Sequence, residues 1–311
     1  KGPINIVVNK HDIFTAPSAE GLTRPVGNGG TYLMWEDEYG RLHAPGDDVL
    51  DDVTELTAQW DQHPSLEPSE TYWFDLSEEG IPETTNGSLP DPSLHWVPFT
   101  YTGTIDAYRL YDLRPQNEYD HSLFIADYNV IHAVSWAIWK EKYPDKDSLI
   151  YENNHTINGI FYCMRAPSAG SDWDGERGIP HSNEWDRILD KNPDYIKNLD
   201  GISSWGQDIP SDSPGRYAVR GGLDARDWDY ADPATQYADI GFRPVLEPLD
   251  SPKSPDDLKV VTLDLNGGSI GTEKGPVNIV VAKGRDFTAP SAEGLTRPVG
   301  SSGTYLAWKA E

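Results

Sequence analysis

The stretch that decides the fold of this chain is RYAVRGG at residues 216–222, taken together with IGFRPVLE at residues 240–247. The paired glycines Gly221 and Gly222 allow a backbone turn that larger residues resist, so they are expected to end a strand and open a loop. The second stretch has the pattern of a strand, on which Phe242 and Arg243 are expected to alternate inward and outward. The sequence therefore predicts two strands joined by a long surface loop.

Three further motifs precede this pair in the chain. They are RAPSAGSD at residues 165–172, IPHSNEWDRIL at 179–189 and SWGQD at 204–208. The second motif predicts a short helix with Ser182 as its N-cap and Glu184 in its first turn. Trp185, Ile188 and Leu189 would share one face of that helix. The third motif, like the opening pair, is expected to lie on a strand edge.

In this order the five motifs resemble the C-type-lectin-like fold of the formylglycine-generating-enzyme and variable-protein type. The resemblance is carried by Arg165, Trp185, Trp205, Arg220, Gly221, Gly222, Gly241, Phe242 and Arg243. It implies a C-type-lectin-like α+β domain over residues 100–248. It also implies that the ligand is held by the loop between the RGG and IGFR motifs.

Catalysis is not expected from this chain. Sulfur-oxidising members of the family depend on cysteines or metal-binding histidines in the C-terminal half, whereas Cys163 is the single cysteine here and His181 is the last histidine. Cys163 lies in the apolar run GIFYCM, which favours a buried side chain over a nucleophile. Because function follows the site and not the fold, we predict no enzyme. An enzyme of the sulfur-oxidising family, testable through Cys163, is the alternative.

The loop LDARDWDYADPATQYAD (Leu223–Asp239) is the candidate binding site. Exposed aromatic groups beside hydrogen-bonding groups suit recognition of a sugar or a protein surface. The alternative is that Trp228 belongs to the core and the aspartates only solvate the loop. The residues predicted to contact ligand are Asp224, Asp227, Trp228, Asp229, Tyr230, Gln236, Tyr237 and Asp239.

No cofactor is predicted, with calcium as the alternative. Asp172, Asp174 and Glu176 offer hard oxygen ligands at close spacing, as does the stretch Asp224–Asp229. Neither stretch has the spacing of an EF-hand loop, and a chain with 51 acidic residues contains such clusters by chance. The eight histidines include no H-x-x-x-H pair, which argues against a catalytic zinc site.

The two ends of the chain repeat each other. Residues 1–38 align with residues 274–311 at a constant offset of 273, and 28 of the 38 positions match. Only the second copy is preceded by LKVVTLDLNGGSIGTE (258–273), and only the first is followed by YGRLHAPGDDVLDDVTELTAQW (39–60). Together these pieces make one module of roughly 75 residues. We interpret the chain as one period, plus an overlap, of a longer tandem array.

The repeated module is expected to be mostly β. Strands are predicted at VVTLDLNGG (260–268), at NIVV in both copies, at GTYLMW and GTYLAW and at VTELTAQW (53–60), with the repeated TAPSAEGLTRPVG as a loop. This order resembles the Listeria-Bacteroides repeat, a small β-grasp-like module of bacterial surface proteins. The resemblance rests on TLDLNGG, on the aromatic strand ending in Trp35 or Trp308, and on LTAQW. It implies modules at 1–61, lacking the first strand, and at 259–311, lacking the last strands.

Two connections complete the division of the chain. Residues 62–99 are expected to be irregular but packed on the following domain, because TYWFDL and LHWVPF would not stay exposed. Residues 249–258 (LDSPKSPDDL) are expected to be a stiff, proline-rich spacer. The predicted fold class is therefore mainly β with some α, in which β-grasp-like repeat modules flank a C-type-lectin-like α+β domain.

Composition limits the partners of the chain. It carries 25 Lys and Arg against 51 Asp and Glu, a net charge of -26 that repels nucleic acid and anionic lipid. No apolar run approaches the ~18 residues of a membrane span. Its 11 Trp, 16 Tyr and 7 Phe indicate a folded protein, since disordered acidic tails are poor in aromatic residues.

Together these features predict a non-enzymatic segment of a large, secreted bacterial cell-surface protein. It would act in adhesion or ligand display, and the lectin-like domain would bind a glycan or a protein surface. The alternative is a structural subunit of an extracellular fibre or surface layer that self-associates through its β modules, by addition of a strand from one chain to another.

Overall fold

The computed structural model describes residues 4–8, 13–18, 32–60, 66–81, 85–107, 119–138, 153–172, 183–249, 257–300, 303, 305 and 307–309. The fold is mainly β, with 36% strand and 7% helix, as the sequence predicts. The chain divides into two compact units, residues 1–65 and 66–311. Among the described helices, none is long and apolar enough to cross a membrane.

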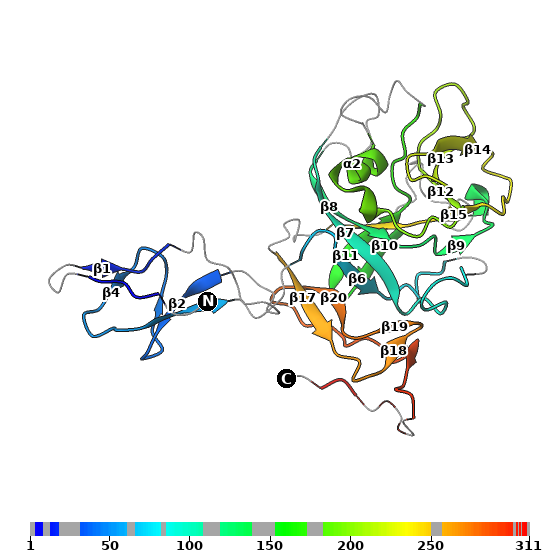
Figure 1. Cartoon of the computed structure of the whole chain (residues 1–311). Helices are drawn as coiled ribbons and strands as arrows, with labels where there is room; N and C mark the ends of the chain where they lie inside the picture. Colours follow the sequence, from blue (N-terminus) through cyan, green and yellow to red (C-terminus); the bar gives the residue numbers. More distant parts are fainter. Residues whose placement is uncertain are drawn as a thin grey trace. The chain divides into compact units, whose positions relative to one another are not determined.

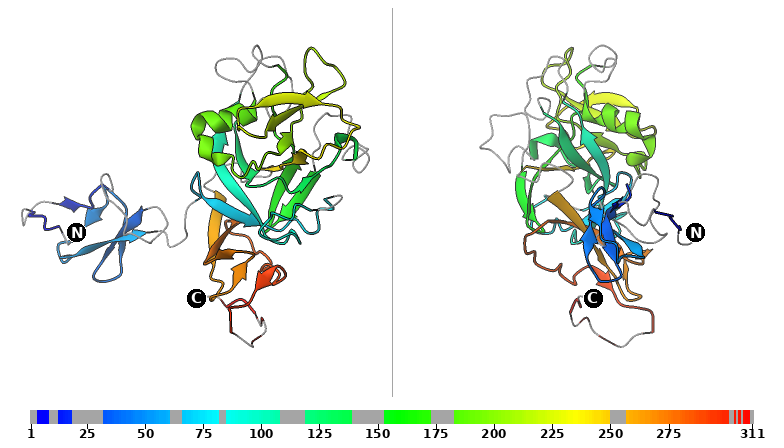
Figure 2. Two further views of the ribbon diagram at one scale, coloured as in Figure 1. Left: turned by 45° about the vertical axis from the view of Figure 1, so that its right-hand side comes forward. Right: turned by 90° about the vertical axis from the view of Figure 1, so that its left-hand side faces the viewer.

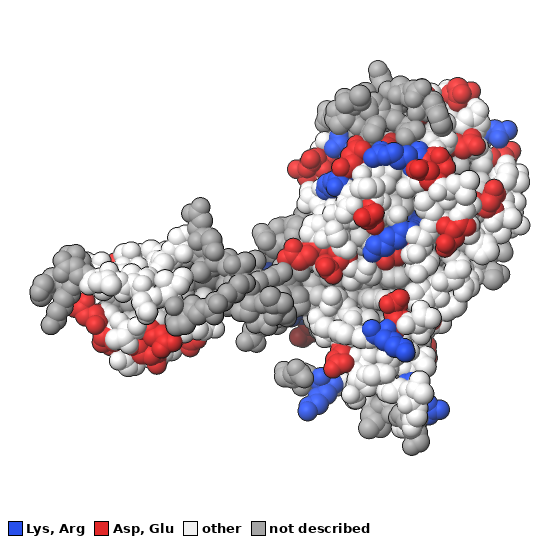
Figure 3. Space-filling model, in the orientation of Figure 1, with Lys and Arg blue, Asp and Glu red and all other residues white. Residues whose placement is uncertain are grey.

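The first unit holds two small antiparallel sheets. β1 (Phe14–Thr15) pairs with β4 (Asp48–Val49), and β2 (Tyr32–Asp37) lies between β3 (Leu42–His43) and β5 (Leu56–Trp60). Asp37 closes the turn after β2, because its buried carboxylate accepts hydrogen bonds from the backbone N–H groups of Tyr39 and Arg41 at 2.9 and 2.8 Å. Acidic side chains gather along one edge of this unit (Figure 3).

The larger sheet of the second unit has six antiparallel strands and curves like half a barrel. In spatial order they are β10 (Asn153–Ile157), β11 (Ile160–Arg165), β16 (Val245–Pro248), β8 (His121–Ala126), β7 (Val97–Ile105) and β6 (Thr71–Phe74). Both faces are covered, because neighbouring side chains of a strand point opposite ways. On β8, Phe124 enters the main core, whereas Leu123 and Ile125 enter a second core under the helix.

The smaller sheet has five strands and shares the main core with the larger one. In spatial order they are β14 (Trp228–Ala231), β13 (Tyr217–Gly221), β12 (Ser203–Trp205), β15 (Ile240–Phe242) and β9 (Ile131–His132). β12 and β15 run parallel, and the other pairs are antiparallel. Trp205, Val219 and Phe242 point into the main core. The strands predicted from SWGQD and RYAVRGG are thereby confirmed. IGFRPVLE, predicted as one strand, forms two, because the chain leaves β15 at Arg243 and Pro244 and enters β16 of the larger sheet.

The predicted helix is α2 (Glu184–Lys191), followed by the short 3₁₀ helix η2 (Pro193–Tyr195). Its N-cap is Asn183 and not Ser182, which lies outside the described residues. The Asn183 side chain accepts a hydrogen bond from the backbone N–H of Asp186 at 2.9 Å. Trp185, Ile188 and Leu189 share the buried face, as predicted. Figures 1 and 2 show α2 beside the strands of the larger sheet.

The first turn of α2 joins the two sheets through buried ion pairs. Glu184 binds Arg165 of β11 through two contacts of 2.7 and 2.6 Å. Asp186 binds Arg220 of β13 through contacts of 3.1 and 2.7 Å. All four side chains are at most 1% exposed. A bidentate carboxylate–guanidinium pair fixes the relative orientation of its two partners, so the helix sets the angle between the sheets.

Two expectations about local structure are wrong. Residues 71–74 and 97–99 are not irregular, because TYWF forms β6 and pairs with β7 in the register Tyr72↔Phe99. The burial expected for this stretch is confirmed, since Tyr72, Trp73 and Phe74 are all buried. Arg243 does not point outward. It is buried and donates hydrogen bonds to the carbonyl oxygens of Ala126 and Asn198 at 2.8 and 3.0 Å.

The C-terminal module of the second unit also contains small sheets. β17 (Leu258–Leu263) pairs with β20 (Val277–Ala282), and β18 (Ser269–Ile270) lies between β19 (Glu273–Lys274) and β21 (Leu295–Thr296). The strands predicted near 260 and at the second NIVV are confirmed. β21 lies within the repeated stretch predicted to be only a loop. Residue 258 already belongs to β17, and residues 250–256 of the predicted spacer lie outside the described residues.

Two predicted strands are absent from the described part of the repeat. NIVV of the first copy has no strand over residues 4–8, and the described residues of GTYLAW (303, 305, 307 and 308) have none either. The corresponding GTYLMW of the first copy does form β2. Closely similar sequences thus form a strand in one copy and, over their described residues, none in the other.

The C-terminal module packs directly on the larger sheet. Trp73 of β6 and Trp96 share a hydrophobic cluster with Ile279 and Val281 of β20. The indole N–H of Trp96 donates a hydrogen bond to the carbonyl oxygen of Glu293 at 2.7 Å. β20 therefore lies beside β6, and β17 pairs with β20 (Figure 1).

The α2 ion pairs give a stability prediction. Replacing Asp186 with Asn leaves Arg220 buried without its counter-charge, so we expect the free energy of unfolding to fall by about 3 kcal/mol or more. Urea unfolding followed by tryptophan fluorescence measures this loss. Asp190→Asn is the matched control, because Asp190 pairs with Arg226 at 3.1 Å on the exposed side of the same helix. It should cost less than about 1 kcal/mol. Equal losses would show that the buried pair has no special role.

Candidate functional site

The predicted ligand loop leaves β13 through two glycines in left-handed conformations. Gly221 has φ +77° and Gly222 has φ +115°. A Cβ on Gly221 would lie 2.9 Å from a methyl carbon of Leu199 and 3.5 Å from the Trp185 ring. Both the conformation and the space therefore require glycine at this turn, as the RGG motif suggests.

Two buried side chains hold the main chain of the loop in place by hydrogen bonds. The Arg220 guanidinium donates to the carbonyl oxygen of Asp227 at 3.1 Å, and the Trp185 indole N–H donates to that of Ala225 at 2.7 Å. Residues 228–231 form β14, which pairs with β13. Four of the seventeen residues of the predicted loop thus form one strand of a β ribbon.

Trp228 faces the core and not the solvent. Its side chain packs with Ala169 and Ala218, and only 8% of the residue is exposed. Its indole N–H donates to the carbonyl oxygen of Gly170 at 2.9 Å. Of the two readings of this residue in the sequence, the structure agrees with the core one. A ligand cannot stack on this ring without unfolding the ribbon.

The two tyrosines of the loop are half-buried. Tyr230 lies with its ring edge against Trp228 at a centroid distance of 5.9 Å, and the Arg216 guanidinium lies 5.7 Å from the Tyr230 ring centroid. Tyr237 packs against Trp205, and its hydroxyl accepts the backbone N–H of Asp232 at 3.4 Å. Each ring has structural contacts on one side and only its remaining edge is open to a ligand.

The polar residues predicted to bind ligand are exposed, but several also stabilise the loop itself. Asp224, Asp227, Asp229, Gln236 and Asp239 all lie at the surface. The Asp224 carboxylate accepts the backbone N–H of Arg226 at 2.8 Å, the Asp227 carboxylate accepts that of Asp224 at 3.0 Å, and the Asp229 carboxylate accepts that of Tyr230 at 2.8 Å. Such side-chain-to-backbone bonds are typical of turns and do not by themselves indicate a ligand.

The candidate calcium ligands are not brought together in the described structure. Asp172 is half-buried, whereas Asp174 and Glu176 lie outside the described residues. The described residues do contain one buried group with suitable donors, namely His121, Glu184 and Glu247. The Arg165 guanidinium already lies among them, 2.6 Å from a Glu184 oxygen and 2.7 Å from a Glu247 oxygen. A protein cation therefore occupies the place where a metal would bind.

The residues of this buried group shift one another's pKa values. Burial lowers the pKa of His121, but the hydrogen bond to Glu184 at 2.9 Å and the charge of Glu184 outweigh it, so the pKa is raised above its usual 6.5. Burial raises the pKa of Glu184, but the charge of Arg165 and the hydrogen bond from His121 hold that pKa well below its usual 4.5. These interactions hold β8, β11, β16 and α2 together through buried charges.

A cavity of about 480 Å³ lies elsewhere in the second unit, at the joint between the larger sheet and the C-terminal module. Three separate stretches supply most of its walls. Residues 73–79 lie on and after β6, residues 156–159 form the turn between β10 and β11, and residues 286–291 follow β20. The aromatic side chains among the lining residues are Trp73, Trp96 and Phe287.

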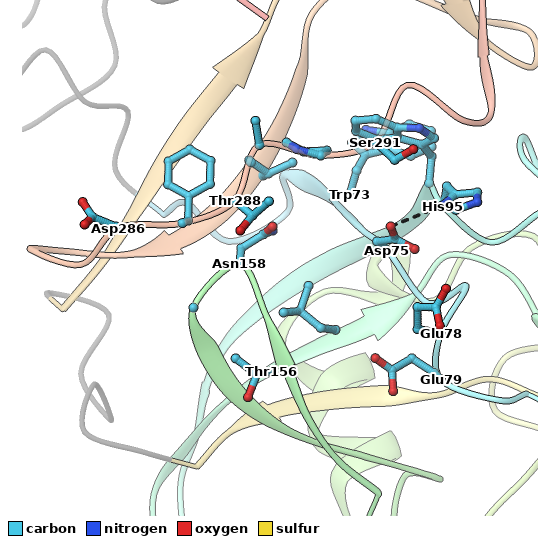
Figure 4. Close-up of a pocket in the computed structure, with 17 residues that line it drawn as sticks. Trp73, Asp75, Glu78, Glu79, His95, Thr156, Asn158, Asp286, Thr288 and Ser291 are labelled. Carbon is cyan, nitrogen blue, oxygen red and sulfur yellow. Dashed lines mark hydrogen bonds and ion pairs between the residues drawn. The ribbon is translucent and has the colours of Figure 1, made fainter. Parts of the chain in front are cut away.

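The polar lining of this cavity is acidic. Its carboxylates are Asp75, Glu78, Glu79 and Asp286, and no Lys or Arg is found among the described residues that line it. Figure 4 shows Glu78, Glu79 and Asp75 on one side, with Asn158 and Thr288 across from them. His95 bridges the two walls: its Nδ1 lies 3.3 Å from an Asp75 oxygen and its Nε2 lies 2.6 Å from a Glu293 oxygen.

Sequence reasoning missed this cavity. It noted that TYWFDL and LHWVPF had to be buried, and those stretches supply Trp73, Asp75, His95 and Trp96. It could not place the β10–β11 turn or residues 286–291 beside them, because the three walls are far apart in the chain. Comparison with known protein families, curated proteins and solved structures finds no match for this chain.

The buried group around Arg165 gives a prediction on pH dependence. A raised histidine pKa contributes stability that is complete below about pH 6.5 and is lost as the pH rises through the folded-state pKa of His121. The Glu184 contribution is present above about pH 4.5 and is lost as the pH falls through its lower folded-state pKa. The stability that the two groups contribute together is therefore largest between about pH 4.5 and about pH 6.5.

The variant His121→Gln isolates the histidine part, since Gln can donate a hydrogen bond but does not titrate. We expect the wild type to exceed this variant in free energy of unfolding by more at about pH 5.5 than at about pH 8. Urea unfolding at the two pH values measures the difference. A gap that does not change with pH would mean that His121 has the same pKa in the folded and the unfolded protein, and a smaller gap at pH 5.5 would mean that folding lowers that pKa.

Proposed function

We propose that this chain is a non-enzymatic, ligand-displaying segment of a large secreted cell-surface repeat protein from a bacterium. In this proposal the second unit is a C-type-lectin-like domain with a β-grasp-like module docked on it, and the first unit belongs to another such module. The burial of the marker residues supports the fold assignment, because Arg165, Trp185, Trp205, Arg220 and Arg243 are all at most 1% exposed. Residues that carry a fold's motif are expected to be those that pack its core.

The absence of catalysis in this proposal is supported by the surroundings of Cys163. Its side chain is buried on β11, where it is 2% exposed. A thiol acts as a nucleophile only where a substrate can reach it, and a side chain that is 2% exposed does not offer that access. The reactive branch of the family would therefore lack its nucleophile here.

The observation that carries the proposal is the acidic, aromatic-walled cavity at Trp73. Ligand sites are concave and combine apolar walls with a few converging polar groups. Carboxylates accept hydrogen bonds from hydroxyl groups, and the half-buried ring of Phe287 can pack against the C–H face of a sugar ring. The four carboxylates would repel an anionic ligand. The lining therefore suits a neutral or amino sugar and disfavours uronic and sialic acids.

The loop Leu223–Asp239 remains a second surface on which a ligand could bind. Its open groups are the edges of Tyr230 and Tyr237 and the exposed Asp229, Gln236 and Asp239. Its largest ring, Trp228, is buried, and none of its residues lines the described cavity. We therefore place the ligand in the cavity and use the loop as the comparison.

Variants on the two surfaces separate these assignments. Glu78 is exposed at the cavity, so Glu78→Gln removes one charged acceptor with little change in shape. Loss of a charge-assisted hydrogen bond of about 1.5 to 3 kcal/mol should weaken sugar binding about 10- to 100-fold. The loop variant Tyr230→Ala with Asp229→Ala should keep affinity within about twofold.

A glycan array with the full chain, followed by calorimetry of the best oligosaccharide with both variants, measures these effects. Loss of binding only in the loop variant would move the ligand to Leu223–Asp239. Failure to retain any neutral or amino sugar would reject sugar binding. A preference for acidic sugars would contradict the argument that the carboxylates of the cavity repel anionic ligands.

A structural role in a fibre or surface layer is the second candidate function. It is favoured by the apolar side chains of Ile4, Ile6, Val7 and Val8 in the first unit, which are 81%, 57%, 97% and 51% exposed. A monomeric surface protein rarely leaves such a run uncovered. The run is a candidate interface between modules.

A further inference from the structure

One tetrapeptide occurs in two different environments in this chain. NIVV at residues 5–8 is identical to NIVV at residues 278–281. In the second copy it forms most of β20, and Ile279, Val280 and Val281 are at most 1% exposed. In the first copy the same letters form no strand and Val7 is 97% exposed. Because the sequences are identical, the difference must come from what surrounds them.

The two copies share one hydrogen bond outside this tetrapeptide. The indole N–H of Trp35 donates to the carbonyl oxygen of Pro17 at 2.8 Å. The indole N–H of Trp308 donates to the carbonyl oxygen of Pro290 at 2.9 Å. Both donor and acceptor are related by the repeat offset of 273. The second copy is therefore a valid guide to the environment that the first copy is built for.

Two neighbours cover NIVV in the second copy. β17 pairs with it edge to edge in the register Val260↔Val280 and Leu263↔Val277. The larger sheet covers it from the side, since Ile279 and Val281 pack with Trp73 and Trp96. Val280 joins the main core together with Val260. Within the described residues of the first unit, neither a β17-like strand nor a β6-like face is present.

The opposite half of the module is described only in the first unit. In the first unit β2 pairs on one side with β3 and on the other with β5. The described residues of the corresponding stretch in the second copy form no strand, and Tyr305 is 49% exposed. The segment that would pair with it has the sequence of residues 39–60, which follows only the first copy.

We propose that Ile4–Val8 is a docking strand whose partner is a second copy of residues 66–273, joined ahead of it in tandem. That copy supplies a strand of the Leu258–Leu263 type and the Trp73–Trp96 face. The register would place Val7 opposite Val260 and Ile4 opposite Leu263. The same junction gives the preceding copy the β3 and β5 strands that it lacks. The completed module is then fixed rigidly on the domain before it.

A separate molecule is a poorer partner for geometric reasons. In each chain β17 is already paired along its length with its own β20, and Trp73 and Trp96 are already covered by that strand. Pairing between molecules would have to expose one NIVV in order to cover another. A tandem copy involves no such exchange. This inference does not depend on sugar binding and stands or falls separately from it.

Thiol accessibility in a two-period chain tests the proposal. Residues 1–273 are joined directly to residues 1–311, and Val7→Cys is introduced either at the first Val7 or at the internal one. Reaction with a thiol reagent under native conditions is then timed. We expect the internal cysteine to react at least about a hundredfold more slowly than the first, because a paired and buried strand reacts only through opening.

Two reference variants of the single-period chain give the reaction rates expected for a buried and for an exposed cysteine. Val280→Cys, at a residue with 0% exposure, should react slowly, and Leu223→Cys, at a residue with 92% exposure, should react quickly. Equal rates at the two Val7 positions of the two-period chain would overturn the proposal. Protection of Val7→Cys in the single-period chain that grows with protein concentration would also overturn it, in favour of a separate molecule.

A second pair of variants covers the case in which cysteine disturbs the strand. Val7→Asp at the internal position should lower the midpoint of thermal unfolding of the two-period chain. The same change at the first position should leave that midpoint unaltered, since Val7 is exposed there. An equal effect at both positions would contradict the docked strand.

Discussion

The second unit depends on one helical turn that carries two buried carboxylates. Glu184 and Asp186 lie at the positive end of α2, and each binds an arginine from a different sheet. Moving four charges out of water costs several kcal/mol per ion, so only near-ideal geometry makes such pairs tolerable. The requirement works as a constraint on the fold. The two sheets can share a core only at the angle that lets Arg165 and Arg220 reach the same turn of helix.

Everything that could bind a ligand is positioned by this constraint. Arg220 also holds the ribbon below the Leu223–Asp239 loop through the carbonyl of Asp227. The larger sheet, fixed by Arg165, ends at β6, where Trp73 forms a wall of the acidic cavity and the floor for the C-terminal module. The buried pairs thus define the scaffold, and the exposed groups at its edges carry the chemistry.

Much of the scaffold could be predicted from the sequence, and the reason is local. Strand alternation and the Gly-Gly turn identify β13 and β15, and the spacing of Trp185, Ile188 and Leu189 identifies α2. The binding surfaces could not be predicted in the same way. Whether Trp228 faces water depends on Gly170, and whether Asp75 lines a cavity depends on residues more than two hundred positions away. Whether a single ring is buried depends on contacts with residues far apart in the chain, and a short sequence motif does not specify those contacts.

The cavity lies at a joint between two bodies, and this gives it a mechanical meaning. Its walls come from the larger sheet and from the C-terminal module, and His95 links an Asp on one to a Glu on the other. A pulling force that separates the module from the sheet would open the cavity and break that link. A ligand that touches both walls would oppose the separation. Under the proposed function, ligand occupancy of the cavity and resistance of this joint to tension would therefore be coupled.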